Sequence, residues 1–140
     1  MKKNNQVLYG YQTTNRAKHN LKIHLILVCK YRKKLLQYGI DVDIKNIIRD
    51  IEGNSDFEII EMETDKDHIH IMIQYIPRVS ISAIVNRIKS ISTKRIWDLH
   101  QKYLQKHFWK EKTFWTDGYF VCSIGEASPE TIRNYIINQG

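Results

Sequence analysis

The stretch of this sequence that most restricts its fold is DHIHIMIQY, residues 67–75. Apolar and polar side chains alternate along it, and alternation with period two is typical of a β-strand with two unlike faces. One face carries Ile69, Ile71 and Ile73, which predicts contact with a hydrophobic core. The other face carries His68 and His70. Polar rings on an interior strand need partners, so other parts of the chain must supply them.

The flanking sequence predicts strands and helices in alternation. The runs expected to form strands are residues 21–32, 57–64, 68–77 and 113–125. The runs expected to form helices are residues 40–54, a long segment capped by Ser80, and residues 128–139, which open with Ser128 and Pro129. The apolar stripe expected along the long helix consists of Ile81, Ile84, Val85, Ile88, Ile91 and Leu99.

The order β, α, β, β, α, β followed by one more helix predicts an α+β fold of the ferredoxin-like, split βαβ type. In that fold an antiparallel sheet carries two helices on one face. If the isoleucines of residues 67–75 face those helices, His68 and His70 point to the other face. The last helix, which carries Tyr135, is expected to cover that second face.

Length and composition indicate one domain. A chain of 140 residues holds one ordinary core, so we expect a single domain over residues 19–140, preceded by a polar N-terminal arm over residues 1–18. The start MKKNNQVLYG lacks the apolar centre of a signal peptide, and runs such as LILVC are far too short to span a membrane. These features predict a cytoplasmic protein.

The charge balance favours an anionic partner. Lys plus Arg number 22 and Asp plus Glu number 15, which gives a net charge of +7. Such an excess indicates either binding to a polyanion such as nucleic acid, which we favour, or simple solubility. The candidate phosphate contacts are Lys30, Arg32, Lys33, Lys34, Arg87, Lys89, Lys94 and Arg95. Each of them could equally be a solvated surface charge.

For three smaller features of the sequence, we favour a structural role over a functional one. The stretch HFWKEKTFW, residues 107–115, interleaves aromatic rings with lysines and could stack unpaired bases, but packing at a core edge or dimer surface is favoured. Asp65 and Asp67 are expected in a turn, with orientation of an imidazole as the functional alternative. Cys29 and Cys122 are expected to be small buried hydrophobic residues.

The residues that suggest chemistry are His68, His70, Tyr135 and Gln139. Two histidines at i and i+2 on a strand can share one cation, and an amide oxygen can add a third ligand. Tyr135 and Gln139 stand at i and i+4, on one side of the last helix. Such an open site suits Mg²⁺ or Mn²⁺ acting as a Lewis acid. The alternatives are a histidine pair that is satisfied by the protein and a tyrosine that only packs the last helix.

Three ordered motifs resemble those of the single-tyrosine transposases of the insertion sequence 200/605 family, within the HUH (His-hydrophobic-His) endonucleases. They are TDKDHIHI, the pattern WTxxxFxxSxG that begins at Trp115, and YxxxQ from Tyr135 to Gln139. The resemblance runs from about Leu21 to Gln139. The given sequence ends at Gly140, where relatives commonly continue.

The resemblance implies a function and a role for each site residue. His68, His70 and Gln139 match the ligands of Mg²⁺ or Mn²⁺, and Tyr135 matches the nucleophile. Members of the family cut and rejoin single-stranded DNA at hairpin-marked ends of small mobile elements, through a transient 5′-phosphotyrosine link and without a nucleotide cofactor. They act as homodimers, and the tyrosine helix of one subunit can complete the site of the other.

Two other functions stay open. The fold could serve as a non-catalytic nucleic-acid-binding module that uses the open sheet face and the basic helix. The chain could also be a domesticated relative that cleaves repeat hairpins but no longer moves an element.

Overall fold

The computed structural model describes residues 6–8, 11–14, 17–123 and 128–139. Its centre is an antiparallel sheet with the strand order β5-β6-β4-β7. The strands are β4 (Leu21–Val28), β5 (Phe57–Thr64), β6 (His68–Tyr75) and β7 (Phe120–Ser123). The helices α1 (Ile40–Gly53) and α2 (Ile81–Gln105) are the crossover connections. This is the predicted ferredoxin-like arrangement.

The two faces of β6 are as predicted. Ile69, Ile71 and Ile73 are all 0% exposed, and in the register with β4 they lie opposite Leu27, Leu25 and Ile23. Full burial of one isoleucine side chain contributes about 1.5–3 kcal/mol. A register slip by one residue would turn this whole row away from the core, so the burial of the isoleucines also fixes the histidines on the opposite face.

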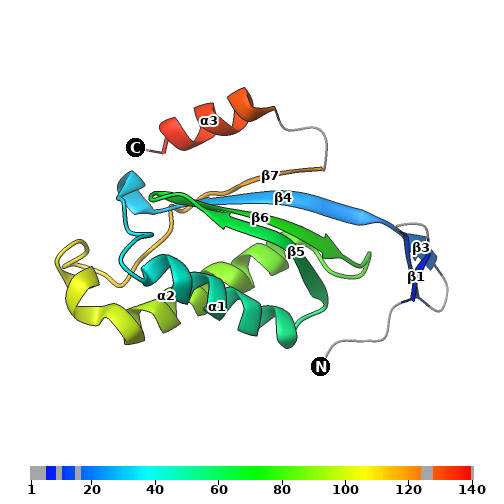
Figure 1. Ribbon diagram of the computed structural model, residues 1–140, viewed down its shortest axis with the longest axis horizontal. Helices are drawn as coiled ribbons and strands as arrows, with labels where there is room; N and C mark the ends of the chain where they lie inside the picture. Colours follow the sequence, from blue (N-terminus) through cyan, green and yellow to red (C-terminus); the bar gives the residue numbers. More distant parts are fainter. Residues whose placement is uncertain (1–5, 9–10, 15–16, 124–127, 140) are drawn as a thin grey trace.

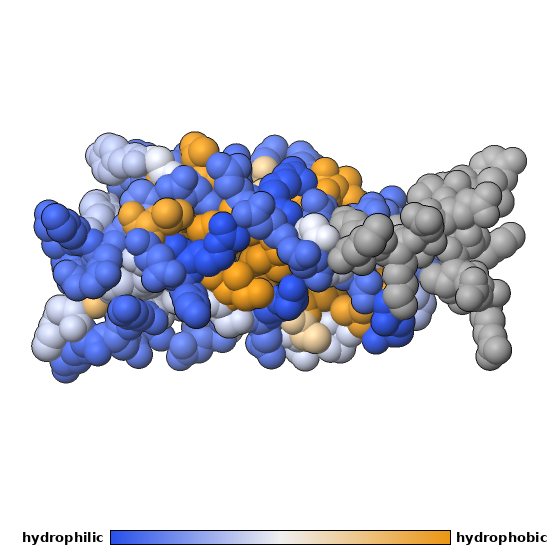
Figure 2. Space-filling view, turned by 90° about the horizontal axis from the view of Figure 1, so that it is seen from below, coloured by the Kyte–Doolittle hydropathy of each residue, from blue (hydrophilic) through white to orange (hydrophobic). Residues whose placement is uncertain are grey.

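The helices α1 and α2 cover the isoleucine face of the sheet (Figure 1). The α1 helix buries the predicted positions Ile44, Ile47, Ile48 and Ile51. The predicted cap of α2 is confirmed, because the Ser80 hydroxyl accepts a hydrogen bond of 3.1 Å from the backbone N–H of Ala83. Seen from the helical side, the surface is mostly hydrophilic with apolar patches toward its middle (Figure 2).

One position of the predicted α2 stripe is wrong. Leu99 is 59% exposed, while Ile96 and Trp97 occupy the core side of this part of the helix. The next residue, His100, has non-helical backbone angles (φ −131°, ψ 35°), which interrupts the regular helical period. The core side of the helix is thus occupied by Ile96 and Trp97, and not by the Leu99 of the predicted stripe, directly before this interruption.

The helix α3 (Pro129–Ile137) lies on the other side of the sheet from α1 and α2, as predicted (Figure 1). The Ser128 hydroxyl accepts a hydrogen bond of 3.1 Å from the backbone N–H of Thr131, and Pro129 follows directly. None of the α3 residues is fully buried. This helix therefore covers the open sheet face without adding a fully buried side chain to the core.

The predicted N-terminal arm contains three short strands that the sequence pattern did not predict. They are β1 (Gln6–Leu8), β2 (Tyr11–Thr14) and β3 (Ala17–His19), and they form a separate antiparallel sheet beyond the start of β4 (Figure 1).

Cys29 is fully buried as expected, whereas Cys122 is partly exposed. In the described parts of the chain, no helix combines the length and the apolar character needed to cross a membrane.

Candidate active site

The open sheet face and α3 enclose a cavity of about 630 Å³, which we call the histidine cavity. His68 and His70 line it and are both partly exposed, so their imidazoles are accessible from solvent. The other lining residues are His24, Arg32, Asp65, Asp67, Pro129, Ile132, Arg133, Ile136 and Ile137. The cavity thus combines a polar floor on the sheet with a largely apolar cover on α3.

His68 is oriented by the residue that precedes it. Its Nδ1 lies 2.8 Å from Oδ1 of Asp67, and a carboxylate at this position holds the proton on Nδ1 and leaves Nε2 as an acceptor. Asp67 is also 3.9 Å from Nε of Arg32, whose Nη1 donates to the backbone carbonyl of Ile137 in α3 over 3.3 Å. Asp67 therefore orients an imidazole, the functional alternative expected for it.

Asp65 has the structural role. Its backbone N–H donates to the carbonyl of His68 over 3.0 Å, and its side chain accepts a 2.7 Å hydrogen bond from the N–H of Lys66. These contacts close the turn between β5 and β6, as the sequence indicated.

His24 belongs to the site although its spacing in the sequence did not single it out. Its Nδ1 lies 2.6 Å from Nε2 of His70, so one ring donates and the other accepts. Burial lowers the pKa of His70, the neighbouring His24 lowers it further, and Glu63 opposes the shift. A signal for His24 existed: it alternates with Ile23 and Leu25, and the first and third strands of a ferredoxin-like sheet are neighbours.

These donors fit a divalent cation, which His68 and His70 would hold. A histidine that holds a metal commonly donates its second ring N–H to a carboxylate, which is the arrangement of His68 and Asp67. The lowered pKa of His70 favours the neutral imidazole that coordination needs. Among the described residues, no group of three or more His, Cys, Asp or Glu side chains could hold a metal ion. A further ligand would therefore have to be of another type, such as the amide of Gln139.

The structure places Tyr135 apart from the histidine pair. Its ring packs against Phe120 of β7 at a centroid distance of 5.5 Å, and a Cβ built on Gly118 would lie 3.7 Å from its hydroxyl oxygen. That oxygen is buried and has no hydrogen-bond partner within the described residues. Burial raises the pKa of Tyr135, and the nearby Thr116 hydroxyl opposes the shift. In this position the phenol is shielded from solvent, and its raised pKa disfavours the phenolate that a nucleophile needs.

Gln139 is the last described residue, two positions after the end of α3, and its backbone N–H donates to the carbonyl of Ile136 over 3.1 Å. Neither Gln139 nor Tyr135 is among the residues that line the histidine cavity. The structure thus brings His68 and His70 together with α3, but it does not bring the four predicted site residues into one constellation.

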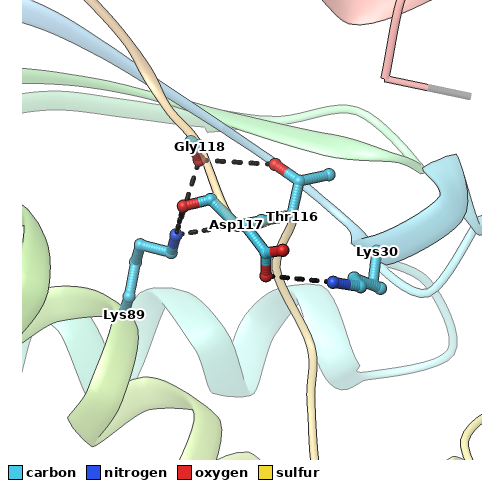
Figure 3. Close-up of polar contacts among 5 residues, drawn as sticks. All are labelled: Lys30, Lys89, Thr116, Asp117 and Gly118. Carbon is cyan, nitrogen blue, oxygen red and sulfur yellow. Dashed lines mark hydrogen bonds and ion pairs between the residues drawn. The ribbon is translucent and has the colours of Figure 1, made fainter.

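Most of the predicted phosphate contacts on α2 make contacts within the protein. Arg87 donates to the Ser55 hydroxyl over 2.8 Å, and Arg95 pairs with Asp50 at 3.0 Å. Lys89 donates to three successive backbone carbonyls, those of Thr116, Asp117 and Gly118 (Figure 3). Lys94 is exposed and lines a groove of about 750 Å³ between α2 and residues 112–117.

The other predicted cluster begins at η1 (Lys30–Arg32). Lys30 forms an ion pair of 3.0 Å with Asp117 (Figure 3), and Arg32 lines the histidine cavity. Lys33 stands 5.9 Å from the ring centre of Phe108, and Lys34 is exposed. In the stretch of residues 107–115, Phe108, Phe114 and Trp115 are buried, which confirms core packing, while Trp109 is 78% exposed.

The sequence is similar to known transposases over most of its length. A family model described as "Transposase IS200 like" matches residues 17–139. The ISDra2 transposase TnpA of Deinococcus radiodurans is 29% identical over 121 residues, which are 86% of this chain and 85% of the relative. The transposase for insertion sequence element IS200 of Salmonella typhimurium is 27% identical over 124 residues, covering 86% and 77% of the two chains.

Solved structures support the same assignment. A crystal structure assigned as a transposase from Deinococcus radiodurans R1 matches with a TM-score of 0.79 at 27% identity, over 99% of this chain and 98% of that chain. The REP-associated tyrosine transposase bound to a REP hairpin matches with a TM-score of 0.50 at 17% identity, over 83% and 62%, which shows a shared fold. Because the family match spans the sheet, the histidine cavity and α3, this chain belongs to the IS200-like family of DNA transposases.

Proposed function

We propose that this transposase cleaves and rejoins single-stranded DNA through a covalent link between Tyr135 and a 5′ phosphate. His68 and His70 would hold Mg²⁺ or Mn²⁺, with the amide of Gln139 as a further ligand. The observation that carries this proposal is the pair of His68, which the Asp67 carboxylate orients, and His70 in a solvent-accessible cavity whose cover is the helix bearing Tyr135.

The chemistry assigned to the tyrosine is a phosphoryl transfer that needs no external energy source. The Tyr135 oxygen forms a bond to phosphorus, the bond from phosphorus to the 3′ oxygen breaks, and the phenolic proton is lost while the 3′ hydroxyl gains one. A divalent cation, when bound, supplies charge stabilisation at the scissile phosphate. Because the phosphotyrosine keeps a phosphodiester bond, a 3′ hydroxyl can attack it in reverse and join a new strand end.

The position of Tyr135 adds one requirement to this proposal. A buried hydroxyl against Gly118 and Phe120 cannot reach a phosphate held in the histidine cavity, so the tyrosine must change position before it reacts. Either α3 shifts over its own sheet, or the α3 of a second subunit supplies the nucleophile. The second route requires a homodimer, which we include in the proposal.

For the DNA we propose single strands with hairpins at the ends of a small insertion sequence. The side chains best placed for phosphates are the exposed Lys34 and Lys94, with Arg32 at the histidine cavity. Lys33 lies between Arg32 and Lys34 in the sequence and is only partly buried. The other predicted basic residues already hold parts of the protein together, so their contribution to DNA affinity should be smaller.

The test is adduct formation with labelled single-stranded hairpin DNA from the ends of the element, in the presence of Mg²⁺ or Mn²⁺. We expect a protein–DNA adduct that resists denaturation and disappears in Tyr135→Phe. The matched control is Tyr38→Phe, because Tyr38 is 84% exposed and lies outside the site. An adduct that persists in Tyr135→Phe would refute the nucleophile, and DNA binding without any adduct, unchanged by EDTA or by His68→Ala, would favour a non-catalytic binding module.

A further inference from the structure

The residues next to the Tyr135 hydroxyl form a short loop, residues 116–118, which we call the tyrosine loop. The loop is attached to the sheet, since the backbone N–H of Thr116 donates to the carbonyl of Val28 over 2.8 Å. Gly118 comes close to the phenol, because a Cβ built on it would lie 3.7 Å from the hydroxyl oxygen. The conformation of this loop therefore sets the surface against which Tyr135 packs.

Lys89 holds the tyrosine loop from the side of α2. Its Nζ donates to the carbonyls of Thr116, Asp117 and Gly118 over 2.7, 2.9 and 3.4 Å (Figure 3). An ammonium group has three N–H donors, so these three acceptors can use all of them. Hydrogen bonds from a charged donor are stronger than those between neutral groups. One side chain thus fixes three consecutive peptide units.

The burial and the neighbours of Lys89 argue against a primary role in binding phosphate. Burial lowers the pKa of Lys89, and so does the charge of Lys30, while Asp117 opposes the shift. A lysine that serves mainly as a phosphate contact would gain from an exposed ammonium group. Lys30 supports the same loop from the other side through its exposed ion pair with Asp117, although such surface pairs contribute little.

We propose that Lys89 is a positioning residue for Tyr135, acting through the three carbonyls of the tyrosine loop. By holding these carbonyls, Lys89 fixes the backbone of Gly118, the residue that lies next to the phenol. The contact is a property of the folded chain, whereas its catalytic meaning rests on the proposed function of Tyr135 as the nucleophile.

The test measures the protection of Tyr135 in the whole protein without DNA or metal. Tetranitromethane nitrates accessible tyrosines, and peptide mass spectrometry gives the rate at Tyr135 relative to Tyr38, the highly exposed reference. In Lys89→Met this relative rate should rise about tenfold, which corresponds to about 1.4 kcal/mol. The control is Lys94→Met on the same helix, which removes the same charge from the groove and should leave the rate unchanged.

A relative nitration rate in Lys89→Met equal to that of the wild type would overturn the proposal. If Lys89→Met does not fold, as judged by circular dichroism, Lys89→Gln is tested by the same criterion, because glutamine keeps two N–H donors without the charge. Lys89→Arg, which keeps a charged donor, should restore part of the protection.

Adduct formation separates this proposal from the proposed function. With hairpin DNA and Mn²⁺, Lys89→Met should change the rate of adduct formation at saturating DNA and leave the Kd for DNA unchanged. A higher Kd for DNA in Lys89→Met, with an unchanged nitration rate at Tyr135, would mean that Lys89 contacts phosphate, which contradicts the positioning role. If the wild type forms no adduct at all while the nitration rates still differ, the nucleophile assignment fails and the structural contact of Lys89 stands.

Discussion

The carboxylate of Asp67 offers the sharpest test of the proposed cation site, because one of its oxygens contacts the proposed ligand His68 directly, while its other partner, Arg32, cannot bind a cation. Its Oδ1 is 2.8 Å from Nδ1 of His68, and both side chains are about one-fifth exposed. Removing a carboxylate that orients a metal-binding histidine typically costs 10–100-fold in metal affinity. Asp67→Ala should therefore weaken Mn²⁺ binding by about 10–100-fold. Asp67→Asn keeps an oxygen acceptor and should lose less.

The assay is direct titration of the protein with Mn²⁺, followed by electron paramagnetic resonance or calorimetry in the absence of DNA. Asp65→Ala is the matched control, since the Asp65 side chain caps the same turn through Lys66 and Asp65 contacts His68 only through its backbone N–H. The backbone carbonyl of Asp67 accepts a hydrogen bond from Cys29 that both substitutions leave in place. Equal Mn²⁺ affinities for Asp67→Ala and the wild type would refute the assignment of His68 as a ligand oriented by Asp67.

Three further predictions concern stability and pH. Ile71→Ala should lower the free energy of unfolding by about 2–5 kcal/mol in urea denaturation, whereas Ile60→Ala, at a side chain 45% exposed, should cost much less. Trp115→Phe should cost about 1–3 kcal/mol, because the indole N–H donates to the buried Ser92 hydroxyl over 3.0 Å, and a double-mutant cycle with Ser92→Ala would show the coupling. Burial raises the pKa of Tyr135, so the folded state keeps a proton that the unfolded state loses near its ordinary pKa of about 10. Stability should therefore fall as the pH rises above about 10, and Tyr135→Phe should make this fall shallower; an identical fall in both proteins would contradict the buried phenol.

The fold was predictable because local pattern and topology agree along β4, β6, α1 and α2. The isoleucines of β6 fix its core face, and because side chains alternate along a strand the histidines must then lie on the opposite face of the sheet. The α1 stripe is regular over its whole length, and all four predicted isoleucines are buried. The prediction fails at Leu99, directly before the helix interruption at His100, which the periodicity of the sequence does not indicate.

The site was predictable only in part, because its partners meet through tertiary contacts. His24 is far from His70 in sequence, and only the pairing of β4 with β6 places Nδ1 of His24 2.6 Å from Nε2 of His70. The role of Lys89 was missed for a related reason. Its three carbonyl acceptors lie in a loop between elements, and a basic residue on a polar helix face carries no sign in the sequence of whether it meets DNA or the protein itself.

The contacts of α3 are compatible with both the burial of the Tyr135 hydroxyl and the movement that the proposed mechanism requires of this helix. The helix has nine residues and buries none of them fully, so it contributes little to the core. Its described side-chain contacts with the sheet side include the Tyr135 ring on Phe120 and the hydrogen bond from Arg32 to the carbonyl of Ile137. Elements held by few buried contacts have the lowest local opening free energies. Moving α3 therefore leaves the isoleucine core intact, and Arg32, which contacts both Asp67 and Ile137, links the histidine side of the site to the position of the helix.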